Sequence, residues 1–357
     1  MTSQMPSDSH HMEFPREVLI GRNVAPLVGA TLTRLAIRGR ALAITGPTVK
    51  SIAAEIIIDS LTRAGFTTSC TVIESATTDH VSRVEEEIRR FSPDVIVGIG
   101  GGKDIDVAKL SSMKSSRQFI SVPTAASHDG IASPLVSMKG MDKPYSYVSH
   151  SPIAIVADTT IIAKSPYRLI ASGCGDVLAK YTAVRDWKLA HRIKNEYYGD
   201  YAAELAMMSS RLVMKNANSI RAVSEAGVRT LVEALISCGV AMSIAGTSRP
   251  CSGAEHLFSH CLTMIAPRPA MHGEQCGVGT ILCAYLHGAN WRLIRDVLHR
   301  IGAPTNAHEL GIEPEYILEA LTRAHSIRPD RYTILGESGL TKEAAQKVAS
   351  VTGVAEF

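Results

Sequence analysis

The feature that most constrains the fold is a glycine-rich turn between a predicted strand and a predicted helix, Val95-Ile-Val-Gly-Ile-Gly-Gly-Gly-Lys103-Asp-Ile-Asp106-Val-Ala-Lys109. The apolar run predicts a buried strand, and the mixed segment after the glycines predicts the start of a helix. Glycines let the backbone approach a ligand closely, and the first N–H groups of a helix are unpaired, so the turn suits a phosphate or pyrophosphate. The spacing differs from the common G-x-G-x-x-G, and a tight turn without a ligand is an equal alternative.

Short β-type runs alternate with helical stretches from residue 18 to about residue 160. The predicted strands cover 41–45, 69–74, 94–99, 118–122 and 153–157. The predicted helices between them cover 50–64, 81–91 and 104–112. Strands that alternate with helices predict a parallel sheet with helices on both of its faces.

The chain changes character after Ser165-Pro166, because strand-like runs almost disappear. The predicted helices cover 167–171, 174–191, 199–218, 223–245, 252–264, 274–286, 290–301, 314–324 and 341–351. A length of 357 residues suggests two domains. We therefore predict an α/β dinucleotide-binding domain over residues 1–164 and an all-α domain over 165–357, with the ligand site in the cleft between them.

Composition excludes several classes of function. The 37 basic and 34 acidic residues are well mixed, and six Phe and two Trp give little stacking surface, so we expect no nucleic-acid partner. Seven cysteines without a C-x-x-C pair argue for a reducing, cytoplasmic environment. The polar start lacks the apolar core of a signal peptide. The apolar run 231–245 contains Glu233, Ser237 and Gly239, which indicates a buried helix and not membrane insertion.

Four side chains in the helical half could carry metal chemistry. Asp176 follows two glycines, near the expected N-terminus of a long helix; His256 and His260 are four apart on one helical face; His272 follows a proline-rich loop. One carboxylate with two or three imidazoles suits Zn²⁺ or Fe²⁺ and leaves a position for a substrate oxygen. Without a metal, the His pair could simply pack, and Asp176 could accept N–H groups at a helix start. Six other histidines are expected to face solvent: His10, His11, His191, His299, His308 and His325.

A third segment links the two halves, Ser121-Val-Pro-Thr-Ala-Ala-Ser-His-Asp129-Gly-Ile-Ala-Ser-Pro134. Its small residues leave room for a flat ring, and its hydroxyl groups could bond an amide or a ribose. An ordinary loop with an Asx turn at Asp129 is an equal alternative.

Together these segments resemble the family that contains iron-dependent alcohol dehydrogenases, glycerol dehydrogenase and dehydroquinate synthase. Within it, they are most similar to the archaeal-type sn-glycerol-1-phosphate dehydrogenases. The matching motifs, in chain order, are GIGGGKDID at 98–106, PTAASHDGIAS at 123–133, GD at 175–176, GAEHLFSH at 253–260 and HGEQ at 272–275. Iron alcohol dehydrogenases usually have Ser or Thr after the three glycines and three histidines at the metal, and dehydroquinate synthase has Glu where Asp176 stands.

The resemblance implies a Rossmann-like domain followed by a helical domain, as in dehydroquinate synthase. It implies that Asp176, His256 and His272 hold a metal ion, with zinc favoured over Fe²⁺ or Ni²⁺. It also implies that Asp129, Asp176 and His260 contact the substrate and act in catalysis. The residues implied to bind NAD or NADP are Gly100, Gly101, Gly102, Lys103, Asp104, Ile105, Asp106, Thr124, Ala125, Ala126, Ser127 and Ser133.

The implied reaction is the NAD(P)H-dependent reduction of dihydroxyacetone phosphate to sn-glycerol 1-phosphate, the backbone of archaeal ether phospholipids. Developing charge on the ketone oxygen would be stabilised by the metal, and the proton would come from His260 or from a metal-bound water. Exposed helical faces favour a homo-oligomer. The alternatives are a glycerol dehydrogenase acting on unphosphorylated glycerol or dihydroxyacetone, a dehydroquinate-synthase-like lyase, and a non-catalytic metal and nucleotide binder.

Three points stay open in the sequence. Arg249 and Arg268 are candidates for the substrate phosphate, although loop arginines are usually solvated. Lys180 is interpreted as a solvated lysine. Glu74 could bond a ribose 2′-OH and so favours NAD. The 2′-phosphate of NADP could instead be bound by Thr45, Thr48 or Lys50, so both cofactors stay possible.

Overall fold

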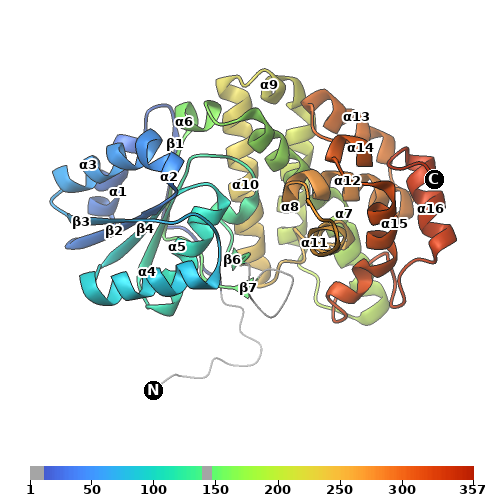
Figure 1. Ribbon diagram of the computed structural model, residues 1–357, viewed down its shortest axis with the longest axis horizontal. Helices are drawn as coiled ribbons and strands as arrows, with labels where there is room; N and C mark the ends of the chain where they lie inside the picture. The colour runs from blue at the N-terminus through green and yellow to red at the C-terminus, as the bar shows by residue number, and fades with distance from the viewer. Residues whose placement is uncertain (1–11, 139–146) are drawn as a thin grey trace.

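The computed structural model describes residues 12–138 and 147–357, in which a parallel sheet lies beside a large group of helices (Figure 1). Six parallel strands have the order β1-β8-β5-β4-β2-β3. They are β1 (Glu17–Gly21), β2 (Arg40–Thr45), β3 (Thr67–Val72), β4 (Val95–Gly100), β5 (Gln118–Pro123) and β8 (Ala154–Asp158). The short strands β6 (Leu135–Val136) and β7 (Tyr147–Val148) form a separate antiparallel pair.

Helices cover both faces of the sheet, which confirms the predicted α/β architecture. Successive strand residues point to opposite faces. Ala41 and Ala43 of β2 therefore pack with α1 (Val28–Arg34) and α3 (Glu55–Arg63), whereas Leu42 and Ile44 pack with α4 (Thr78–Phe91) and α5 (Gly102–Lys114). The remaining short elements of this part are η1 (Ala25–Leu27), α2 (Pro47–Val49), η2 (Lys50–Ala54), η3 (Asp129–Ile131) and α6 (Thr159–Ala163).

From Tyr167 onward the chain contains helices and no strand, as predicted. These are α7 (Tyr167–Lys194), α8 (Asp200–Lys215), α9 (Ala217–Arg221), α10 (Glu225–Ala245), α11 (Ala254–Ile265), α12 (His272–Leu286), α13 (Trp291–Ile301), α14 (Ala307–Leu310), α15 (Pro314–Arg323), η4 (Ala324–Ile327) and α16 (Lys342–Thr352). Helix α10 is long and apolar enough to cross a membrane, yet 67% of its most apolar window is buried inside the protein. It is the buried helix that the sequence predicts. The domain division at residues 164 and 165 remains a prediction.

Helix α7 corrects one expectation. The glycines before Asp176 predict a helix start there, but α7 runs unbroken through them, so Asp176 lies well inside the helix. The glycines serve close packing instead. A Cβ atom on Gly173 would lie 1.9 Å from the carbonyl oxygen of Ala126, and one on Gly175 would lie 2.1 Å from that of Gly273. Because other backbones pass so close to α7, larger side chains cannot occupy these positions.

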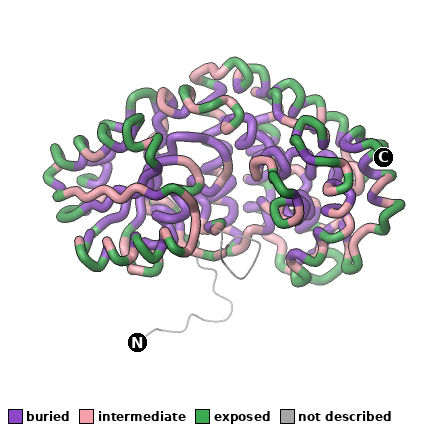
Figure 2. The backbone as a smooth tube through the Cα atoms, in the orientation of Figure 1, coloured by how far each residue is buried: buried purple, intermediate pink, exposed green. Residues whose placement is uncertain are grey.

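The carboxyl ends of β4 and β5 bring two predicted motifs to the junction with the helices. The amide of Thr124 donates to the carbonyl of Gly100 over 2.9 Å and ties the two turns together. The buried Lys109 of α5 donates to the carbonyls of Gly130 and Leu135, each over 2.8 Å, and so holds the following loop. Figure 2 shows that the backbone is largely buried where the sheet meets the helices.

Candidate active site

A cavity of about 450 Å³ lies between the sheet and the helices. Its sheet side is formed by the glycine turn and the loop after β5, and its helical side by α11 and the start of α12. The lining includes Gly102, Lys103, Asp106, Asp129, Ser133, His256, His260 and His272. The glycine turn and the predicted metal-ligating histidines therefore face one space.

A lysine lies between two of the predicted site carboxylates. The Nζ atom of Lys180 is 2.7 Å from Asp176 Oδ1 and 2.8 Å from Asp129 Oδ2, and its side chain is 0% exposed. The amide of Asp129 also donates to Asp176 Oδ2 over 2.7 Å. Burial opposes charge on both partners, but their attraction dominates: it raises the pKa of Lys180 well above its usual value and lowers that of Asp176 well below. The interpretation of Lys180 as solvated is wrong.

His256 lies between two buried carboxylates. Its Nε2 atom is 3.4 Å from Asp176 Oδ1, and its Nδ1 atom is 2.8 Å from Glu255 Oε1. The same Glu255 accepts from the hydroxyl of Thr182 over 2.7 Å and from the amide of Gly253 over 2.6 Å. Burial opposes protonation of His256, but the Cys276 sulfur and these carboxylates raise its pKa well above the usual range. Glu255 therefore orients the ring and turns Nε2 toward Asp176.

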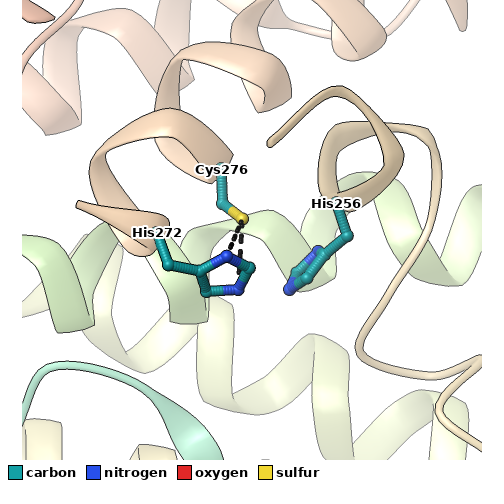
Figure 3. A group of neighbouring side chains, drawn as sticks. All are labelled: His256, His272 and Cys276. Atoms are coloured by element: carbon teal, nitrogen blue, oxygen red, sulfur yellow. Dashed lines mark hydrogen bonds between the residues drawn. The ribbon is translucent and has the colours of Figure 1, made fainter. Parts of the chain in front are cut away.

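His272, the first residue of α12, lies next to His256 (Figure 3). The two ring centres are 5.1 Å apart, and the ring centre of His260 is 5.7 Å from that of His272. The hydroxyl of Ser259 is 3.1 Å from His272 Nδ1. Burial and the other two imidazoles lower the pKa of His260 well below its usual value, so this ring is neutral at pH 7.

Cys276 is a site residue that the sequence analysis missed. Its sulfur lies 3.6 Å from His272 Nε2, and donor atoms of Cys276, His256 and His272 lie within 4.8 Å of one another (Figure 3). Burial raises the pKa of this thiol, but the two imidazoles outweigh that effect and bring it down to about 7. The spacing of Cys276 four residues after His272 was the available signal, since it puts both on one face of α12.

This group of side chains fits a divalent metal. Asp176 offers a carboxylate oxygen, His256 and His272 offer imidazole nitrogens, and Cys276 adds a sulfur beside them. Both imidazoles also have a hydrogen-bonding partner behind them, Glu255 for His256 and Ser259 for His272. Such partners are typical of metal-binding histidines. The structure thus brings Asp176, His256 and His272 together, while their role as ligands remains a prediction.

The three glycines of the turn have different surroundings. Gly100 has a φ of +151°, and a Cβ atom there would lie 2.0 Å from Asp104 Oδ2. A Cβ on Gly102 would lie 1.8 Å from His128 Nε2, whereas one on Gly101 would meet nothing within 4 Å. The amide of Gly101 donates to Asp104 Oδ2 over 3.2 Å, and burial raises the pKa of this carboxyl to about 6. Open space at the start of α5 is therefore found at Gly101.

The other residues implied to bind the cofactor divide into two groups. Ser133, Lys103 and Asp106 line the cavity. The amide of Ser137 donates to Asp106 over 2.9 Å, and Lys103 donates to the carbonyl of the exposed Glu74 over 3.0 Å. The remaining five are buried and do not line the cavity: Ile105, Thr124, Ala125, Ala126 and Ser127. Of the residues considered for a 2′-phosphate, Thr48 and Lys50 are exposed and Thr45 is buried.

Neither predicted phosphate-binding arginine lines this cavity. Arg249 is 2% exposed, and its guanidinium pairs with Glu196 and donates to the carbonyl of Tyr332 over 2.9 Å. Arg268 is exposed on the loop before α12. Arg249 is thus a structural residue. Among the histidines expected to face solvent, His191, His299 and His308 are exposed, His325 is half-buried, and His10 and His11 lie outside the described residues.

A single carboxylate of α7 holds the cavity's helical wall in place. Asp186 Oδ2 accepts from the amide of Ala254, the first residue of α11, over 2.7 Å. Asp186 Oδ1 accepts from the amide of Ile334, also over 2.7 Å, and lies 3.0 Å from His287 Nε2. The start of α11 and the segment after η4 are therefore fixed to the same side chain.

Residues 19–166 match the family model described as iron-containing alcohol dehydrogenase. Glycerol-1-phosphate dehydrogenase [NAD(P)+] of Thermococcus kodakarensis is 53% identical over 97% of this chain and 98% of its own length. The protein of the same name from Methanothermobacter thermautotrophicus is 51% identical over 97% of this chain and 99% of its own. These similarities cover nearly the whole chain.

Solved structures with much lower identity share the fold. Glycerol dehydrogenase from Schizosaccharomyces pombe has a TM-score of 0.78 at 22% identity, covering 98% of this chain and 95% of its own. Maleylacetate reductase from Agrobacterium tumefaciens has a TM-score of 0.74 at 16% identity, covering 98% of both chains. At these identities the likeness concerns the fold alone.

Proposed function

Because the chain belongs to the family of glycerol-1-phosphate dehydrogenases, we propose that it reduces dihydroxyacetone phosphate to sn-glycerol 1-phosphate with NADH or NADPH. The class is therefore NAD(P)-dependent oxidoreductase. The observation that carries the site assignment is the cavity of about 450 Å³, which the glycine turn borders on one side and His256, His260 and His272 on the other. A hydride donor at the turn and a ketone at the histidines would meet within it.

The proposed cofactor site is the start of α5. The open space at Gly101 would receive the pyrophosphate against the first N–H groups of the helix, and Lys103 adds positive charge beside it. Asp106 and Ser133 line the path from this turn toward the histidines. The bound nicotinamide supplies the hydride of the reaction.

The proposed metal ligands are Asp176, His256 and His272, and the proposed metal is zinc. When bound, a zinc ion polarises the ketone oxygen. Lys180 fixes the distance between Asp176 and Asp129, because its ammonium group bonds both carboxylates. Asp129 is then placed to bond the substrate at the cavity wall.

His260 is the proposed proton donor. It lines the cavity beside His272, and its lowered pKa keeps it neutral at pH 7. A neutral imidazole can donate from one nitrogen while the other accepts a proton from solvent, so it can pass protons without staying charged.

We also propose a cytoplasmic homo-oligomer with a role in ether-lipid synthesis. All seven cysteines are unpaired thiols, which suits a reducing compartment. Helix α8 presents Tyr201, Met208 and Leu212 to solvent on one side, and Tyr201 is 76% exposed. Side chains at this spacing form an apolar stripe that a second copy could cover.

The decisive test measures NADH and NADPH oxidation by the purified protein with dihydroxyacetone phosphate and, separately, with dihydroxyacetone. Each assay is run before and after EDTA treatment, with stereochemical analysis of the product. We expect metal-dependent activity on the phosphate ester and a 1-phosphate product. Equal or better turnover of unphosphorylated dihydroxyacetone would instead identify a glycerol dehydrogenase, and absence of net NAD(P)H turnover would contradict both.

A further inference from the structure

We propose that Arg328 binds the phosphate group of the substrate and so selects phosphorylated over unphosphorylated ketones. This inference rests on the proposed function, because it assigns the far end of the same substrate. A phosphate ester needs a cation at that end, and the planar guanidinium group matches two phosphate oxygens at once. The cavity lining within residues 12–138 and 147–357 includes two permanent cations, Lys103 and Arg328.

Lys103 belongs to the nucleotide end of the cavity. It is the second residue of α5, directly after the open space at Gly101, and its ammonium group donates to the carbonyl of Glu74. Arg328 enters from the opposite, helical side. It follows η4 directly, and η4 packs against α11, the helix that carries His256 and His260.

Arg328 and the proposed proton donor, His260, line the same cavity. The guanidinium group of Arg328 therefore belongs to the space that also holds the proposed reacting end. A phosphate placed beside Arg328 would leave the rest of a three-carbon chain directed toward the histidines.

The neighbouring Arg331 is built into the wall and supports this site. It is 6% exposed, donates to the carbonyl of Ser252 and to the hydroxyl of Ser248, each over 2.7 Å, and its amide donates to the carbonyl of Arg328. Ser248 and Ser252 line the same cavity as Arg328. Arg331 is thus a positioning residue that holds the Ser248 hydroxyl, the Ser252 carbonyl and the backbone of Arg328 together.

Asp330, an acidic neighbour of Arg328, does not close the site. Asp330 lies 3.4 Å from the guanidinium group, but its side chain is 66% exposed. Ion pairs with exposed carboxylates contribute little to stability. A phosphate dianion in the cavity offers Arg328 a second charge and two parallel hydrogen bonds, so it would compete effectively with Asp330.

The test compares Arg328→Gln with wild type on dihydroxyacetone phosphate and on dihydroxyacetone. Loss of charged hydrogen bonds should lower kcat/KM for the phosphate ester roughly 10- to 100-fold, mainly through KM, and change kcat/KM for dihydroxyacetone by less than about threefold. Arg328→Lys should fall between the two, because it keeps the charge without the planar fork. The matched control is Arg323→Gln, since Arg323 is an exposed arginine of α15 paired with Glu319, and it should leave both substrates unchanged.

Inorganic phosphate gives an independent readout. It should inhibit dihydroxyacetone reduction competitively in wild type and at least about tenfold more weakly in Arg328→Gln. An equal loss on both substrates, or unchanged phosphate inhibition, would overturn the role of Arg328. If wild type shows no preference for the phosphate ester, the proposed function itself fails; if wild type prefers the ester and Arg328→Gln retains that preference, only this inference fails.

Discussion

Lys180 shows how much a single residue can determine in this site. Its side chain is fully buried, and its ammonium group bonds Asp129 from the sheet side and Asp176 from α7. Isolated buried charges are strongly destabilising, whereas a compensated group is tolerated. The raised pKa of Lys180 means that its stabilisation is complete below the ordinary lysine pKa and lost as pH rises through the folded value. The lowered pKa of Asp176 means that its stabilisation is complete above the ordinary carboxyl pKa and lost as pH falls through the folded value. At pH 7 both contributions are present.

Replacement of Lys180 by Met should therefore lower the free energy of unfolding at pH 7 by about 3–5 kcal/mol, because the buried Asp176 and the half-buried Asp129 lose their cation. The change is measured by urea unfolding. Lys188→Met is the matched control on the same helix, where the side chain is exposed, and it should change stability by less than about 0.5 kcal/mol. A loss of similar size in both variants would contradict the role of Lys180 as the compensating charge.

Cys276 poses a second question at this scale, because its sulfur lies as close to His272 as a fellow ligand would. If Asp176, His256 and His272 are the ligands, Cys276→Ser should keep about one metal per chain, and His272→Ala should fall well below one. Metal content is measured by elemental analysis after dialysis. A Co²⁺-substituted wild type should then lack a sulfur-to-cobalt absorption band. Metal loss in Cys276→Ser, or the presence of that band, would move the ligand set to His256, His272 and Cys276.

The glycine turn is the element whose ligand can be tested without disturbing the fold. Gly101 has a φ of −82° and open space at its Cβ position, so a side chain fits there in the free protein. Gly101→Val should cost about 1 kcal/mol of stability at this helix start but weaken NADH binding at least about tenfold, since it fills the proposed phosphate position. Nicotinamide fluorescence titration measures the affinity, and Gly101→Ala should be intermediate. Unchanged NADH affinity in both variants would show that the phosphates bind elsewhere.

Elements with a clear period or a strong boundary were predictable from the sequence. Strand β4 and helix α5 were recognised because the apolar run, the glycines and the mixed segment follow one another without ambiguity. Strand β1 is not among the predicted strands, because its apolar run is only three residues long, Val18 to Ile20. Helix α7 was divided at Gly173, because a sequence cannot distinguish a glycine that ends a helix from one that admits a neighbouring backbone.

The site was predictable only as far as its motifs were continuous in sequence. Asp176, His256 and His272 could be selected by residue type, and the structure brings them together. Lys180 and Arg328 could not be selected, because their importance depends on the fold around them. Lys180 pairs with Asp129, 51 residues away, and Arg328 lines the same cavity as His260, 68 residues away. The prediction of Arg249 as a phosphate-binding residue is wrong for the same reason, since its partner Glu196 lies in another part of the chain.

At the scale of the whole molecule, the reaction space belongs to neither half alone. The sheet contributes the glycine turn and Asp129, and the helices contribute the histidines and Arg328. Contacts that join the halves include the backbone approach of Ala126 to Gly173 on α7 and the ion pair between Lys180 and Asp129. Fold and site are therefore coupled: a change that separates the halves also separates the proposed cofactor turn from the proposed metal ligands.

The hydrogen bonds to Asp186 also affect which length of substrate the cavity can accept. One carboxylate holds both the start of α11, which carries the histidines, and the backbone at Ile334, a few residues beyond Arg328. Asp186 thus helps to fix the distance between the proposed carbonyl end and the proposed phosphate end of the cavity. Such a site would select substrates by their length. A ketone one carbon longer or shorter could meet the histidines or the arginine, but not both at once.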